Sequence, residues 1–177
     1  MPQRRLRNLP PARQTALRRD FPWLRAVAWD ETPLPSNLKS MSITVFDHWL
    51  SREEANRLLE NVPPDEQLDR QARHAKFCAL LTAQTQVLSF AFRRHAKNRS
   101  VFREFTSAQA LTAYYTPHGG PSLRHRMFQV VLPELQCAFF EGWDDTHHFF
   151  YTQPAGIDRI REWASWCGLY VLDSPAM

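Results

Sequence analysis

The spacing of the hydrophobic residues changes part-way along the chain, and this change constrains the fold more than any other feature. Between residues 52 and 82, apolar side chains recur every three or four positions, as on one face of an amphipathic helix. From residue 127 onward the chain is instead rich in β-branched and aromatic residues, which favour strands. Helical segments followed by strands are typical of an α+β domain.

Local signals indicate where the helices of the N-terminal half begin and end. Ser51 and Glu54 have the spacing of a capping box, which begins a helix at residue 52. The apolar pattern then continues to about residue 95, as one helix or two, with a strand over 87–92 as the alternative. Ser100 and Ser107 could each cap a short helix, whereas residues 111–116 could equally form a strand. We expect helices in this half over 11–19, 52–61 and 65–82.

The C-terminal half has the pattern of a β-hairpin with further strands. Gly142 to Asp145 form the expected hairpin connection, and Pro154 and Gly168 bound an expected helix. The sequence therefore predicts an α+β fold with a helix-rich N-terminal half. Its C-terminal half should hold an antiparallel hairpin or small sheet, followed by a helix and a final strand. The expected strands are 127–132, 135–141, 146–152 and 169–172.

Proline and charge divide the chain into two expected parts. Residues 1–40 form a basic, proline-containing arm, whose aromatic patch at residues 21–29 should dock on the rest of the protein. Residues 41–177 form a single α+β domain. We expect a chain without the arm to keep its fold largely intact.

The charged residues lie in blocks of alternating sign. The net charge is +4, but residues 1–19 hold six arginines and no acid, and residues 69–103 hold eight lysines and arginines against Asp69 alone. Two such blocks favour binding to a polyanion, either nucleic acid or an acidic protein surface. The alternative is that the blocks neutralise one another or are solvated. The expected nucleic-acid-binding residues are Arg4, Arg5, Arg7, Arg93, Arg94, Lys97, Arg99 and Arg103.

The second basic block contains two further features. If it is helical, Arg93 and Lys97 share one face. Its interleaved phenylalanines could stack on bases, or they could belong to the core. These are Phe90, Phe92, Phe102 and Phe105.

Histidines and aspartates near the hairpin suggest an alternative function, a metal-assisted hydrolase. Their spacing matches no metal motif, and aspartates are also ordinary hairpin residues. On a strand, His147 and His148 face opposite sides, so only one of them could reach a shared site. We therefore expect no metal site and regard these residues as weak candidates only. They are His118, His125, Asp144, Asp145 and His147.

Other features favour a binding protein over an enzyme. The chain has five glycines and no P-loop or dinucleotide-binding motif, so we expect no cofactor. Trp143, at the expected hairpin tip, could anchor a protein partner, as in an immunity or antitoxin-type inhibitor. Three cysteines without a CxxC motif, no export signal and no long apolar run predict a cytoplasmic protein that does not contact a membrane. The sequence does not indicate an oligomeric state.

Overall fold

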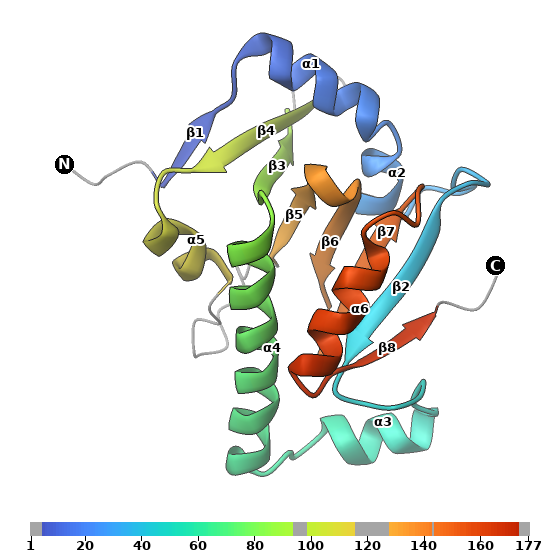
Figure 1. Ribbon diagram of the computed structural model, residues 1–177. Coiled ribbons are helices and arrows are strands. Elements are labelled where there is room, and N and C mark those ends of the chain that lie inside the picture. Colours follow the sequence, from blue (N-terminus) through green and yellow to red (C-terminus); the bar gives the residue numbers. More distant parts are fainter. Residues whose placement is uncertain (1–4, 94–98, 116–127, 143, 174–177) are drawn as a thin grey trace.

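The computed structural model describes residues 5–93, 99–115, 128–142 and 144–173, and shows an α+β fold (Figure 1). The strands are β1 (Leu6–Asn8), β2 (Lys39–Thr44), β3 (Leu88–Phe92), β4 (Ser100–Phe105), β5 (Gln129–Leu132), β6 (Cys137–Glu141), β7 (Thr146–Tyr151) and β8 (Tyr170–Asp173). The helices are α1 (Pro11–Asp20), α2 (Leu24–Ala28), α3 (Arg52–Leu59), α4 (Pro64–Gln84), α5 (Ala108–Tyr115) and α6 (Ile157–Trp166), and a 3-10 turn, η1, spans Pro133–Leu135.

The strands form one antiparallel sheet in the order β1-β4-β3-β5-β6-β7-β2-β8. The expected C-terminal hairpin is β6–β7, and it lies inside this sheet rather than forming a small sheet of its own. The predicted α+β class is thus confirmed. The sheet is larger than the sequence suggested because four of its strands come from the first 105 residues.

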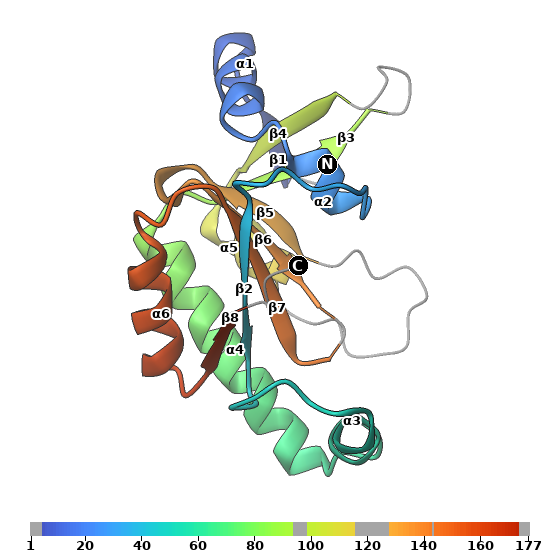
Figure 2. The same cartoon turned by 90° about the vertical axis from the view of Figure 1, so that its right-hand side faces the viewer.

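One face of the sheet is covered by α4 and α6, which lie on the same side in Figure 2. Aromatic rings fill the core between them and the strands. Phe139 and Phe149 stack with centroids 4.6 Å apart, and Phe77 of α4 meets both rings edge-on. The three cysteines are also buried in this core. They are Cys78, Cys137 and Cys167.

Burial changes the acidity of these thiols. Removal from water raises the pKa of Cys78 to about 12 and also raises the pKa of Cys137 and Cys167. All three are therefore protonated at neutral pH.

The other face of the sheet carries a second core cluster, built by the N-terminal segment. Leu17 and Phe21 at the end of α1, and Trp23 and Leu24 next to and within α2, are buried against residues of β3, β4, β5 and β6. The first 28 residues thus supply the cover for this face. The expectation that the fold survives their removal conflicts with this packing, because a hydrophobic sheet face would be exposed to water.

The basic segment after α4 is extended. The alternative strand over 87–92 is observed, because α4 ends at Gln84 and Leu88 begins β3. Leu88 and Phe90 point to the second core cluster, and β3 pairs with both β4 and β5. The next segment divides into β4 and α5. The helix expected after Ser107 is observed as α5, and the Ser107 hydroxyl accepts from the Ala110 N–H at 3.1 Å. A helix beginning at Ser100 and a strand over 111–116 are wrong, because Ser100 begins β4 and α5 extends to Tyr115. Among the described helices, none has the length and apolar character needed to cross a bilayer.

Candidate anion-binding site

Strand pairing brings the two basic blocks together. β1 of the N-terminal block pairs with β4 of the second block, so that Arg7 lies opposite Glu104 and Asn8 opposite Arg103. The Nε of Arg7 also bonds Oε1 of Glu104 at 2.7 Å, on the exposed surface. The paired residues are 95 to 99 positions apart in sequence, yet they share one edge of the sheet.

Helix α1 continues this edge beyond the end of β1. The buried side chain of Gln14 donates from Nε2 to the carbonyl oxygen of Phe102 at 2.6 Å, and its Oε1 accepts from the Phe102 N–H at 2.9 Å. One helical turn later, Nε of Arg18 donates to the carbonyl oxygen of Ser100 at 2.9 Å. Side chains of α1 thus satisfy backbone groups of β4 that have no neighbouring strand.

Three arginines converge beside this junction around a hollow of about 270 Å³, here called the arginine hollow. Arg18 comes from α1, and Arg93 and Arg99 come from the facing ends of β3 and β4, where the Arg93 N–H donates to the Arg99 carbonyl at 3.2 Å. None of the described lining residues is acidic. Besides the three arginines they are Asn8, Leu9, Pro11, Gln14, Thr15 and Val101.

The electrostatics of the arginine hollow favour an anion. Partial burial, followed by the charges of Arg99 and Arg93, lowers the pKa of Arg18. Three like charges around one hollow repel one another, and an anion between them would relieve that repulsion. Guanidinium groups can also bind a phosphate through two parallel hydrogen bonds.

The structure places the other expected basic residues around the same edge. Arg103 and Arg7 line a neighbouring hollow of about 630 Å³, which shares Asn8 with the arginine hollow. Arg5 is exposed at the start of β1. Arg4, Arg94 and Lys97 lie outside the described residues.

Two expectations about the second basic block need correction. Arg93 directly follows β3 and is not helical, so the condition for a shared helical face with Lys97 is not met at Arg93. Lys97 itself lies outside the described residues. Phe90 and Phe102 are buried in the second core cluster, and Phe92 packs against it. Phe105 packs against the first cluster. These rings therefore build the core, and base stacking is not available to the buried pair.

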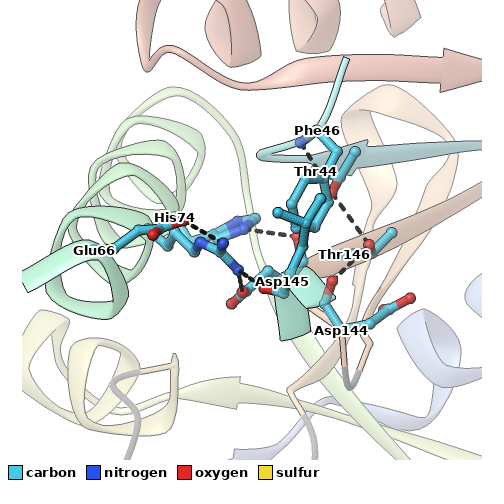
Figure 3. A network of polar contacts seen from close by, with 9 residues as sticks. Thr44, Phe46, Glu66, His74, Asp144, Asp145 and Thr146 are labelled. Carbon is cyan, nitrogen blue, oxygen red and sulfur yellow. Dashed lines mark hydrogen bonds and ion pairs between the residues drawn. The ribbon is translucent and has the colours of Figure 1, made fainter. Parts of the chain in front are cut away.

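Of the histidine and aspartate candidates, Asp145 contacts α4 through His74 (Figure 3). Asp145 adopts a left-handed backbone with φ of 53° in the β6–β7 turn, and its carbonyl oxygen accepts a hydrogen bond from Nε2 of His74 at 3.0 Å. His147 is buried beside His74, whereas His148 points to the opposite face and contacts Ser42. Across the described part of the chain, no three or more His, Cys, Asp or Glu side chains are placed to hold a metal ion.

Sequence reasoning missed the buried cation in this region. Arg70 of α4 is only 5% exposed and bonds Oδ2 of Asp145 at 3.0 Å, Glu66 one turn before it, and the Leu58 carbonyl oxygen at 2.9 Å. Burial acts to lower the pKa of Arg70, but the two carboxylates outweigh burial and raise it. Asp145 is therefore occupied by an ion pair, and Asp144 is exposed. His118 and His125 lie outside the described residues.

The remaining sequence-based site is Trp143, which also lies outside the described residues, so a hairpin-anchored partner stays a prediction. Comparison of the chain with protein-family models, with curated proteins and with solved structures finds no match.

Proposed function

We propose that the protein binds nucleic acid through the arginine hollow and the adjoining basic edge of the sheet. The observation that carries this proposal is the convergence of Arg18, Arg93 and Arg99 around one hollow whose described lining holds no acid. Phosphates of a nucleic-acid backbone match this arrangement in charge and in hydrogen-bonding geometry.

The arrangement supports backbone recognition more than base reading. The described side chains of the hollow are guanidinium, amide, hydroxyl and aliphatic groups, and these position a phosphate chain without reading sequence. Affinity should therefore depend weakly on base sequence and strongly on salt.

Fluorescence anisotropy with labelled DNA and RNA oligonucleotides across a salt series tests this proposal. The double variant Arg93→Gln/Arg99→Gln should lose at least about tenfold in affinity at low salt, since one charge-assisted contact contributes about 1.5 kcal/mol or more. Its salt slope should decrease by about 1 for each arginine removed.

The matched control is Arg52→Gln/Arg57→Gln on α3, which removes the same charge from exposed positions outside the arginine hollow. If both double variants lose affinity equally, binding follows net charge and the assigned site is wrong. Polyglutamate serves as a competitor, and competition equal to that of the oligonucleotide would indicate an acidic protein surface as the partner. Absence of binding at low salt would contradict the proposal.

A further inference from the structure

A second cavity, of about 220 Å³, lies between α4 and the β6–β7 hairpin, in a different part of the molecule from the arginine hollow. We call it the histidine cavity. The residues that define its chemistry are His74, Cys78, Tyr115, Phe128, Glu141 and His147.

Two neutral imidazoles line this cavity, and they carry buried nitrogens that have no hydrogen-bond partner among the described residues. His147 is 8% exposed, and both of its ring nitrogens are buried without a hydrogen-bond partner among the described residues. His74 lies edge-on to it at a centroid distance of 4.3 Å. Because Nε2 of His74 donates to the Asp145 carbonyl, its Nδ1 carries a lone pair, and this atom is also buried without a described partner.

Burial keeps both rings uncharged. It lowers the pKa of His74 and lowers that of His147 to well below its ordinary value, with the neighbouring histidines acting in the same direction on His147. Each ring therefore offers an acceptor nitrogen at neutral pH. A buried polar atom without a partner is costly, and a ligand that donates to it would remove that cost.

A carboxylate completes the set of acceptors. Oε2 of Glu141 accepts from the Phe128 N–H at 2.8 Å, and Glu141 has no ion-pair partner among the described residues. The other carboxylate of the cavity, Asp145, is neutralised by Arg70. The described lining thus carries one uncompensated negative charge, next to the aromatic rings of Tyr115 and Phe128.

We propose that the histidine cavity binds a small organic cation, a primary ammonium on a compact apolar body. An ammonium group has three donors and no acceptor, which matches the lone pairs of His74 and His147 together with the Glu141 carboxylate. The aromatic walls favour both the positive charge and the apolar body. This site is independent of nucleic-acid binding, and neither proposal requires the other.

Isothermal titration with phenethylamine and butylamine tests the site, with 2-phenylethanol and phenylacetate as neutral and anionic counterparts of the first amine. We expect an amine to bind at least about tenfold more tightly than the alcohol, and phenylacetate to bind most weakly. No heat from either amine at about 10 mM would overturn the proposal. Equal binding of amine and alcohol would overturn it as well, because charge would then play no part.

Two variants locate the binding. Glu141→Gln keeps an oxygen for the Phe128 N–H but removes the charge, and should weaken amine binding at least about tenfold. Glu162→Gln, the same change at an exposed position of α6, should leave it unchanged. Ala75→Phe fills the cavity without altering its polar groups and should abolish binding. Retained binding in Glu141→Gln or in Ala75→Phe would place the amine elsewhere.

Competition with zinc tests a metal site at the same place. If zinc displaces the amine from the unchanged protein, and the variant His147→Phe no longer binds zinc, the cavity is a metal site and the proposal is overturned.

Discussion

The side-chain amide of Gln14 forms two hydrogen bonds with the backbone of Phe102, and these two residues are separated by 88 positions. The amide takes the place that a neighbouring strand would otherwise fill, because β1 pairs only with Arg103 to Phe105 of β4. This contact fastens α1 to the sheet and holds Arg18, one turn further along, at the arginine hollow.

Replacing Gln14 by alanine should destabilise the protein. The change leaves the buried N–H of Phe102 without its partner, and the Phe102 carbonyl keeps only the long bond of 3.5 Å from the Leu9 N–H, at a cost of about 1–3 kcal/mol. Urea unfolding followed by circular dichroism measures the loss. Gln109→Ala, at an exposed position of α5, should change the free energy of unfolding by no more than about 0.5 kcal/mol. Equal effects of the two changes would show that the contact is not stabilising.

Two arginines one turn apart on α4 should differ sharply in their effect on stability. Arg70 is 5% exposed and pairs with Asp145, so Arg70→Ala leaves a carboxylate without its partner at a cost of about 3–5 kcal/mol. Arg73 is 41% exposed and pairs with Asp69, so Arg73→Ala should cost no more than about 0.5 kcal/mol. Thermal unfolding of both variants under one set of conditions makes the comparison. A similar loss of stability in each would contradict the assigned role of Arg70.

Stability should fall as the pH falls below about 6.5. An unfolded histidine takes up a proton near that pH, whereas His74 and His147 stay neutral in the folded protein because burial lowers their pKa. The unfolded chain then binds more protons than the folded chain, so acid favours unfolding by at most about 1.4 kcal/mol per pH unit for each histidine. Urea unfolding at several pH values between about 8 and 5 gives the free energy of unfolding at each pH, and its change with pH is this slope. His147→Phe should reduce the slope, and an unchanged slope would assign it to other groups.

Removing residues 1–28 should abolish cooperative unfolding. The deletion takes away Leu17, Phe21, Trp23 and Leu24, which cover one face of the sheet. The remaining chain should bind anilinonaphthalene sulfonate and lose a sharp thermal transition. A chain lacking only residues 1–4 is the control and should unfold as the full chain does. A sharp transition after the longer deletion would show that the N-terminal segment is dispensable.

Local signals in the sequence predicted local structure well. The capping box of Ser51 and Glu54 is present, with both of its hydrogen bonds, because it depends only on residues three positions apart. The sequence of Leu88–Phe92 allows either a strand or a helix. Its apolar residues suit both structures, and the choice depends on pairing with β4 and β5, which come later in the chain.

The candidate sites show the same limit. Charge counting identified Arg93 and Arg99, since they lie in a visible basic block. The role of Gln14 and Arg18 depends on the open edge of β4, which only the three-dimensional arrangement reveals. His74 and Arg70 face the hairpin only because α4 packs on the sheet, so a search for motifs could not associate them with His147 or Asp145.

The three buried cysteines make it possible to measure how often the helices separate from the sheet. Cys78 lies on α4, Cys137 on β6 and Cys167 directly after α6, and all belong to one core cluster. Cys78 lines the histidine cavity, whereas Cys137 has no exposed surface. A thiol-specific reagent in water therefore reaches Cys137 only when the helices separate from the sheet. The rate at which such a reagent consumes the Cys137 thiol measures how often that side of the molecule opens, with no label introduced into the chain.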